Sequence, residues 1–368
     1  MLRTTLRILV VGAGIAGLAA ARALRLAGFR PEVVDKLPAS TVAGAGIFLP
    51  GNAARALRAL DLEAPVRPYG EVVERQRFLD VRGRPLCDVD LTELWAGVGE
   101  SRALSRADLH RVMLSGAGGE VRHETEVKAV EIGDGSAKVE FGDGSSGEYD
   151  LVVGADGRRS AVRTLAGLGD AARPVGHVVY RSVITGGPAI ADWTGVFGKR
   201  STFTVMPMGA GRLFCHADES CGTAPPDPLA RFREVFGGLG GPVPAVVEAV
   251  ERVQVAVTDE VEIDAWSKGP VVLVGDAAHA TSPTLAQGAA MAFEDAVVLA
   301  AELRRAGDVP DALSGYERRR RPRTQWVLDR TRDRDKLGDV PSALRDPLLR
   351  RRGRRLLADH YRDLVAAY

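Results

Sequence analysis

The chain has 368 residues, of which 45% are hydrophobic, so it can build a large core and two packed domains. Its 49 Lys and Arg against 48 Asp and Glu give a formal net charge of +1, and no apolar run approaches the ~20 residues of a membrane span, so we expect neither nucleic-acid nor membrane partners. Three scattered cysteines without a C-x-x-C pair argue against a zinc or disulfide framework, so we expect no metal and a reducing, cytoplasmic location.

The first elements predicted along the chain form a βαβ unit. Leu6 to Val11 is a short apolar run typical of a buried parallel strand. Ile15 to Ala27 is rich in alanine and leucine and has no proline, which predicts a helix that Gly28 can end. Pro31 to Asp35 then predicts a second strand, so a glycine-rich turn lies between the first strand and the helix.

That turn, G-A-G-I-A-G at residues 12–17, fits the pattern of a pyrophosphate cradle. Gly12 permits a tight turn, Gly14 lets the backbone approach a pyrophosphate, and Gly17 lets the helix pack closely on the strand. Ala16 lies in the same helix start, whose N–H groups face the anion. Asp35 ends the second strand, where a carboxylate accepts hydrogen bonds from an adenosine ribose. The pattern predicts a bound dinucleotide; a glycine-rich turn that binds nothing is the alternative.

Strand-like segments dominate the middle of the chain, and helical patterns dominate its end. The pattern is helical from Ala289 to about Arg305 and mostly helical from Asp311 to Tyr368. Gly142-Asp143-Gly144 reads as a hairpin turn. The predicted strands lie within residues 71–90, 121–141, 151–153, 177–184, 201–217, 253–263 and 271–274.

Two later motifs also follow predicted buried strands, G-A-D-G-R-R-S-A-V-R at residues 154–163 and G-D-A-A-H at residues 275–279. Asp156 and Asp276 stand at strand ends, where a carboxylate can accept from the ribityl hydroxyls of a flavin. Gly288, Ala289 and Ala290 begin the later helix, whose N–H groups can stabilise negative charge on a reduced flavin. These features favour FAD over NAD, although each motif could simply join a core strand to the next element.

The three glycine segments resemble the class A flavoprotein aromatic hydroxylases, single-component FAD monooxygenases related to p-hydroxybenzoate hydroxylase. The resemblance covers roughly residues 6–325, and P-x-x-A-Q-G-A at residues 283–289 is most similar to the salicylate, 3-hydroxybenzoate and urate hydroxylase branch. It implies an α/β fold, with a Rossmann-like FAD-binding domain, an inserted mixed β-sheet substrate domain and C-terminal helices. The predicted ranges are 1–70, 101–170 and 266–325 for the FAD-binding domain, 71–100 and 171–265 for the substrate domain, and 326–368 for a C-terminal helical tail.

The resemblance also implies contacts at the adenosine and phosphate end of FAD. Arg106 is expected against the FAD phosphates or ribityl chain, although Ser105 and Asp108 have capping-box spacing and allow a solvated helix-start arginine instead. Lys36 is expected to approach the adenosine end. Val127 is expected to contact adenine through its backbone, with a plain strand residue as the alternative.

Three further residues are candidates for the flavin face or the substrate. Tyr180 and Arg181 are neighbours in a predicted strand, and Arg181 could fix a carboxylate or phenolate through two hydrogen bonds. A sheet-face arginine is the alternative. Pro283 is the third candidate. His279 is interpreted as a structural hydrogen-bonding group, so no catalytic base is assigned.

The resemblance implies a complete reaction. NADPH or NADH reduces FAD, O2 adds to give a C4a-hydroperoxyflavin, and one oxygen atom passes to an aromatic or other electron-rich small molecule. One alternative is different flavin chemistry on the same scaffold, such as that of an epoxidase, oxidative decarboxylase or reductase. Another is a non-catalytic flavin-binding protein. A monomer or a homodimer is expected.

Overall fold

The computed structural model of the chain describes residues 6–41, 45–170 and 172–368; residues 1–5, 42–44 and 171, which fall within the predicted domain ranges, lie outside the description. Its first sheet is mostly parallel and buried on both faces, as the continuous apolar runs predict. The sheet has the order β18 (Ser267–Lys268), β19 (Val271–Leu273), β12 (Leu151–Gly154), β1 (Ile8–Val11), β2 (Glu32–Val34) and β8 (Val121–Arg122).

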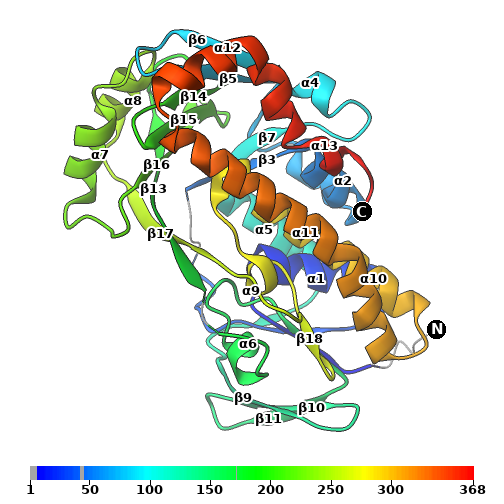
Figure 1. The fold of residues 1–368 in the computed structure, drawn as a ribbon. Coiled ribbons are helices and arrows are strands. Elements are labelled where there is room, and N and C mark those ends of the chain that lie inside the picture. The colour runs from blue at the N-terminus through cyan, green and yellow to red at the C-terminus, as the bar shows by residue number, and fades with distance from the viewer. Residues whose placement is uncertain (1–5, 42–44, 171) are drawn as a thin grey trace.

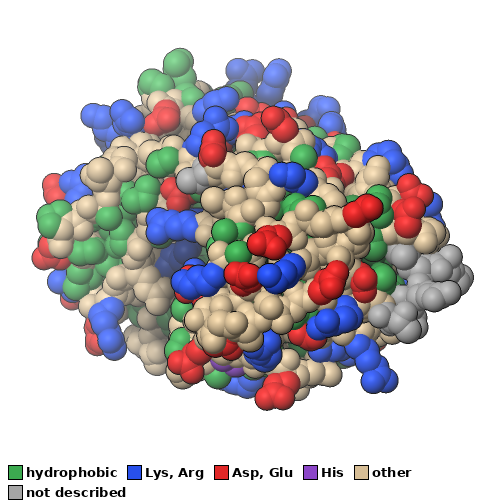
Figure 2. Space-filling view, turned by 90° about the horizontal axis from the view of Figure 1, so that it is seen from below, with side chains coloured by type: hydrophobic (Ala, Val, Ile, Leu, Met, Phe, Trp, Pro, Cys, Tyr) green, Lys and Arg blue, Asp and Glu red, His purple; other side chains and the backbone are tan. Residues whose placement is uncertain are grey.

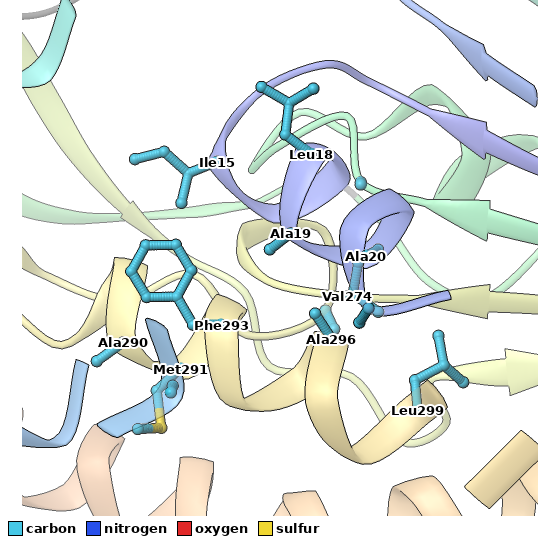
Figure 3. Close-up of a cluster of buried hydrophobic side chains, with 14 of the residues drawn as sticks. Ile15, Leu18, Ala19, Ala20, Val274, Ala290, Met291, Phe293, Ala296 and Leu299 are labelled. Atoms are coloured by element: carbon cyan, nitrogen blue, oxygen red, sulfur yellow. The ribbon is translucent and has the colours of Figure 1, made fainter. Parts of the chain in front are cut away.

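Helices α1 (Ile15–Leu26) and α10 (Gly288–Arg305) pack against each other beside this sheet. Figure 3 shows the small side chains Ala19 and Ala20 of α1 close to Ala296 of α10, with Phe293 filling the space beside them. Small residues let the two helices approach closely, which brings the starts of both helices to one side of the sheet. The other helices of this part are α2 (Gly51–Ala59), α3 (Glu63–Val66), α5 (Arg106–Ala117), α6 (Ala161–Leu165) and α9 (Asp276–His279).

Two small antiparallel sheets complete this part of the fold. One has the order β11 (Ser146–Tyr149), β10 (Ala137–Phe141) and β9 (Val127–Ile132), and it lies at the bottom of the view in Figure 1. The other has the order β3 (Gly46–Leu49), β7 (Arg102–Ser105) and β4 (Glu71–Val72). Because β3 also contacts β13 and β16, this second small sheet joins the parallel sheet to the rest of the molecule.

A seven-stranded sheet forms the second large unit. Along its strands, apolar side chains on one face pack under α7 (Pro228–Phe236) and α8 (Val243–Ala249), while polar and aromatic side chains occupy the other face. Its order is β17 (Gln254–Glu260), β13 (Arg173–Thr185), β16 (Arg212–Ser220), β15 (Ser201–Pro207), β14 (Trp193–Phe197), β5 (Arg75–Leu79) and β6 (Pro85–Asp90), with α4 (Leu91–Leu94) after β6.

The long helix α11 (Val309–Asp339) connects the two units, running diagonally across the molecule in Figure 1. It packs on α10 at one end and reaches η1 (Pro283–Leu285) and β15 at the other. Helices α12 (Ser342–Asp359) and α13 (Arg362–Val365) follow, and α12 covers β6. The predicted α/β fold class is confirmed. The predicted domain limit at 325/326 falls inside the continuous helix α11. The predicted domain ranges as a whole stay a prediction.

The surface carries mixed charge. On the face shown in Figure 2, basic and acidic side chains alternate, as the net charge of +1 leads one to expect. Within the described ranges, no helix is both long and apolar enough to cross a membrane.

Candidate active site

A cavity of about 300 Å³ lies between the parallel sheet and the seven-stranded sheet. One side of the cavity is lined by the turn before α1, strand β3, the start of α5, the turn after β12 and the segment from α9 into α10. The other side is lined by strands β5, β13, β14, β15 and β16 and by the C-terminal part of α11. The predicted site residues that line it are Gly14, Ala16, Arg106, Arg181, Asp276, Pro283, Gly288 and Ala289. Those that do not line it are Gly12, Gly17, Asp35, Lys36, Val127, Asp156, Tyr180 and Ala290.

The first glycine turn requires glycine for geometric reasons. Gly12 has a φ of +108°, and a Cβ there would lie 2.5 Å from the carbonyl oxygen of Ala155. A Cβ on Gly17 would overlap the carbonyl oxygen of Gly12. Gly14, in contrast, has open space beside it and lines the cavity. Gly12 and Gly17 therefore shape the turn, and Gly14 presents it to the cavity.

The residues predicted for the adenosine end lie beyond the cavity. The carboxylate of Asp35 accepts hydrogen bonds from the N–H groups of Ala13 at 2.6 Å and Leu37 at 2.8 Å, so it braces the glycine turn. Lys36 is exposed beside it. Val127 is a buried core residue at the start of β9. The predicted contacts of these residues with an adenosine stay predictions.

Asp156 is held by the start of α6, and its predicted contact with ribityl hydroxyls stays a prediction. Its carboxylate accepts from the N–H groups of Ala161 at 2.7 Å and Val162 at 3.1 Å, and from the Ser160 hydroxyl. These groups open α6, so Asp156 satisfies orphan donors of a helix start and turns away from the cavity. The next basic residue, Arg158, lines the cavity instead.

Buried Arg163 joins the second glycine segment to the third. Its guanidinium donates to the carbonyl oxygens of Arg158 and Ala277 at 2.9 Å each, and to that of Asp170 at 3.0 Å. The sequence analysis quoted Arg163 only as part of a motif. Its role depends on a carbonyl more than a hundred residues away, and no local pattern shows that.

The turn at Gly275 is held against the first glycine turn. Gly275 has a φ of +60°, and a Cβ there would lie 2.7 Å from the Cβ of Ala16. Its N–H group donates to Asp295 at 2.8 Å, and His279 Nε2 lies 2.6 Å from the same carboxylate oxygen. This contact is consistent with the structural interpretation of His279. Asp276 then faces the cavity.

A buried ionic network supports this turn from below. Arg320, which has no exposed surface, donates to Asp295 at 2.8 Å and to Glu294 at 2.7 Å. Arg323 also donates to Glu294, at 2.7 Å. Burial raises the pKa of Asp295, but the charges of His279 and Arg320 outweigh it and lower that pKa to about 2. Asp295 therefore stays ionised and keeps hold of the turn.

The start of α10 opens onto the cavity through Gly288 and Ala289. No acidic residue lies in its first turn, so its N–H groups and dipole can act on a negative charge. Buried Gln287 is anchored by Asn52 at 2.9 Å. The side chain of Ala290 is buried in the core, as Figure 3 shows, so only its backbone belongs to this helix start.

Three arginines and one carboxylate gather at this end of the cavity. Arg158 lies 4.0 Å from Asp276, while the guanidinium groups of Arg106 and Arg181 make no hydrogen bond or ion pair with any described residue. Burial lowers the pKa of Arg106, and burial together with the charges of Arg158 and Arg106 lowers that of Arg181 to about 10. Three guanidinium groups therefore face one carboxylate, so the group carries excess positive charge and favours an anionic guest.

The adjacent residues Tyr180 and Arg181 lie on opposite faces of β13. Tyr180 is fully buried among the aromatic rings of α7 and donates to Glu219 at 2.6 Å. The prediction that Tyr180 meets flavin or substrate is therefore corrected. Arg181 pairs in register with His216 of β16 on the cavity face. Burial, and secondly the charge of Arg181, lower the pKa of His216 to about 3, so its imidazole is neutral.

The far wall of the cavity is aromatic and partly acidic. Asp218 from β16 and Asp335 from α11 line it, and the sequence analysis identified neither. Burial raises the pKa of Asp335 to about 6, and Asp218 adds to this. The apolar part of this wall is formed by Phe78, Trp193, Phe197, Met206 and Phe214.

The described residues fit an FAD molecule. The first turn has space at Gly14 for a close approach of phosphate, and it opens on a helix start without acidic side chains. The guanidinium of Arg106 lines the cavity and has no ion-pair partner among the described residues. The Thr281 hydroxyl, in the segment after α9, is buried at the cavity without a hydrogen-bond partner among described residues. A polyanionic cofactor with several acceptor oxygens meets these demands.

Comparisons with known proteins agree with this arrangement. A family model described as "FAD binding domain" matches residues 5–331. The chain is 32% identical over 326 residues to an aurachin C monooxygenase/isomerase of Stigmatella aurantiaca, covering 86% of this chain and 85% of that protein. It is 34% identical over 367 residues to a 3-amino-4-hydroxybenzoate 2-monooxygenase of Streptomyces platensis, covering 93% and 91%. The solved structure of Klebsiella pneumoniae HpxO complexed with FAD and uric acid has a TM-score of 0.88 and 26% identity, covering 98% of this chain and 97% of that one.

Proposed function

The chain belongs to the FAD binding domain family of flavin hydroxylases, and on this premise we propose that it is a single-component monooxygenase. It would use NADPH or NADH and O2 to hydroxylate an aromatic or other electron-rich small molecule. One observation carries the proposal: a single cavity extends from the glycine turn of the nucleotide fold to the aromatic face of the seven-stranded sheet. A cofactor and a small molecule can therefore share one enclosure, as oxygen transfer between them requires.

On the cofactor side, the chain contributes binding and charge. Gly14 and the start of α1 would hold the pyrophosphate, and Arg106 would pair with phosphate or ribityl oxygens. The start of α10 at Gly288 and Ala289 would face negative charge on the reduced ring. FAD, when bound, supplies hydride acceptance from the nicotinamide and activation of O2.

On the substrate side, the chain orients the acceptor and excludes water. Arg181 is placed to bind a carboxylate or phenolate, and the neutral His216 beside it can add a hydrogen bond. The aromatic wall opposite gives an apolar surface for a ring and keeps solvent from the reacting atoms. The aminohydroxybenzoate in the name of one relative and the uric acid in one solved complex support an aromatic substrate.

The test is anaerobic reduction of the FAD-loaded protein by NADPH and by NADH, followed through the visible flavin absorbance. Each reaction is run alone and with 4-hydroxybenzoate, 3-amino-4-hydroxybenzoate or uric acid. We expect one of these compounds to accelerate bleaching, and we expect labelled oxygen from 18O2 to appear in its product. The matched variant Arg181→Met should keep FAD and lose the acceleration.

Two results would overturn the proposal. FAD that neither nucleotide reduces, with any of the compounds, would indicate a flavin-binding protein or an enzyme reduced by a partner. Reduction followed by a product without labelled oxygen would indicate other flavin chemistry, such as oxidative decarboxylation.

A further inference from the structure

The function proposed above makes no use of an acidic pair at the substrate end of the cavity, Asp218 on β16 and Asp335 on α11. Both side chains line the cavity beside aromatic rings. Placing a carboxylate away from water beside aromatic rings costs free energy unless hydrogen-bond donors contact its oxygens. The acidic pair therefore needs donors, and the protein supplies few of them.

The acidic pair has unused acceptor capacity. One oxygen of Asp335, Oδ1, accepts from the hydroxyls of Thr284 and Ser282, the latter at 3.3 Å. The other oxygen, Oδ2, has no donor among the described residues. Asp218 faces His177 Nδ1 at 3.8 Å, which is within ion-pair range but too long for a hydrogen bond.

Arg334, an arginine at the same end of the cavity, makes no ion pair with either residue of the acidic pair among the described contacts. Arg334 precedes Asp335 in α11, is 7% exposed and also lines the cavity. Its guanidinium lies over the ring of Phe78, 4.7 Å from the ring centre, and its Nη1 has no partner among the described residues. This end of the cavity therefore holds one buried nitrogen, Arg334 Nη1, and one half-buried carboxylate oxygen, Asp335 Oδ2, without a partner among the described residues.

The sheet register sets the acidic pair apart from the arginine end. Arg181, His216 and Thr204 stand side by side on neighbouring strands, and Asp218 and Thr202 form the next polar row on the same face. Two residues along a strand separate these rows, a distance of about 7 Å. The row with Arg181 favours an anionic oxygen of a bound molecule, and the row with Asp218 favours hydrogen-bond donors of that molecule. Aromatic side chains surround both rows.

We propose that the acidic pair selects an aromatic substrate that carries a hydrogen-bond-donating nitrogen, namely an amino group, on the side away from the oxygen held by Arg181. An aromatic amino group fits because it presents two N–H donors, one for each carboxylate, and keeps its protons beside them. This inference rests on the proposed function and adds the substrate class. An analogue without the donor leaves a carboxylate unpaired and binds about ten- to a hundredfold more weakly.

The test measures Kd for three probes on the FAD-loaded enzyme, without NADPH or NADH, from the change in flavin absorbance on titration. The probes 3-amino-4-hydroxybenzoate, 4-hydroxybenzoate and 3-methoxy-4-hydroxybenzoate differ only at one ring position. We expect the amino probe to bind at least about tenfold more tightly than the unsubstituted probe. The methoxy probe, which brings only an acceptor, should bind most weakly.

The variants Asp335→Asn and Asp218→Asn should each reduce this preference to about threefold or less while FAD stays bound. Asp339→Asn is the matched control, because Asp339 lies one helical turn beyond Asp335, pairs with exposed Arg200 at 3.5 Å and does not line the cavity. It should keep the full preference.

A wild-type enzyme without preference for the amino probe, including one that binds none of the probes, overturns the inference. So does a preference that survives both substitutions. These failures are distinguishable from failure of the proposed function. An enzyme that NADPH or NADH reduces and that oxygenates some other compound loses only the substrate class, whereas FAD that cannot be reduced removes the proposed function itself.

Discussion

Replacing Arg320 with methionine tests whether the buried ionic network supports the fold beneath the site. The substitution keeps an apolar stem but removes the guanidinium that joins Glu294 and Asp295 at 2.7 and 2.8 Å. All three side chains are fully buried. The two carboxylates would therefore lose a shared cation in a place that water does not reach.

The magnitude follows from what each carboxylate retains. Removing one partner of a buried ion pair costs about 3–5 kcal/mol. Glu294 keeps Arg323 at 2.7 Å, and Asp295 keeps His279 at 2.6 Å and the N–H of Gly275 at 2.8 Å. These remaining partners place the expected loss at the lower end, about 3 kcal/mol, which is a large part of a typical total stability.

The assay is urea unfolding at pH 7, followed by tryptophan fluorescence. Arg318→Met is the matched control, because Arg318 is exposed on the same helix and makes no ion pair within the described part of the chain; it should change stability by less than about 0.5 kcal/mol. If Arg320→Met cost no more than this control, the reasoning about the network would be refuted. The Gly275 turn would then have to be held by Asp295 and His279 without help from Arg320.

Three further predictions concern the site. Gly12→Ala should abolish the retention of FAD during gel filtration, because the φ of Gly12 is +108° and a new Cβ would lie 2.5 Å from the carbonyl oxygen of Ala155. Gly307→Ala is the control, since the space beside Gly307 is open, and an equal FAD content in the two variants would contradict the prediction. Arg181→Met should weaken binding of 4-hydroxybenzoate about tenfold or more in flavin titrations without loss of FAD, and an unchanged Kd would exclude the anion role. Asp335→Asn should raise the free energy of unfolding by about 2 kcal/mol at pH 8 but hardly at pH 4, because a folded-state pKa of about 6 lies above the usual carboxyl value near 4, so the cost of ionisation grows between these two pH values and is complete only above about pH 6. Equal urea midpoints of variant and wild type at pH 8 would show that the carboxylate is not strained.

The cofactor end of the site could be predicted because its determinants are local. Gly12, Gly14 and Gly17 belong to one turn, and their spacing is visible within six residues, although the contact with Ala155 that excludes a Cβ at Gly12 is not. The strands β1, β12 and β19 are continuous apolar runs, which parallel strands covered on both faces require. Arg106 was found through family resemblance, since its own sequence context fits a helix start equally well.

Asp156 and Tyr180 lie outside the cavity lining for different reasons. Asp156 is followed by Ser160 and the start of α6, and a short polar side chain before a helix start is as typical of capping as of ligand binding. Tyr180 and Arg181 are adjacent in a strand, so only one of them can face the cavity. The apolar residues Val178 and Ile184 share the parity of Tyr180, and this alternation already indicates that Tyr180 faces the core.

The acidic pair shows where sequence reasoning ends. Arg334 and Asp335 stand in a charged stretch of α11 that is indistinguishable by pattern from a solvated helix surface. They reach the cavity only because a helix from Val309 to Asp339 is long enough to leave α10 and cross β15. The crossing point depends on helix length and on packing at both ends. Residues that determine substrate choice here thus depend on tertiary contacts, whereas those that determine the cofactor depend on a single turn.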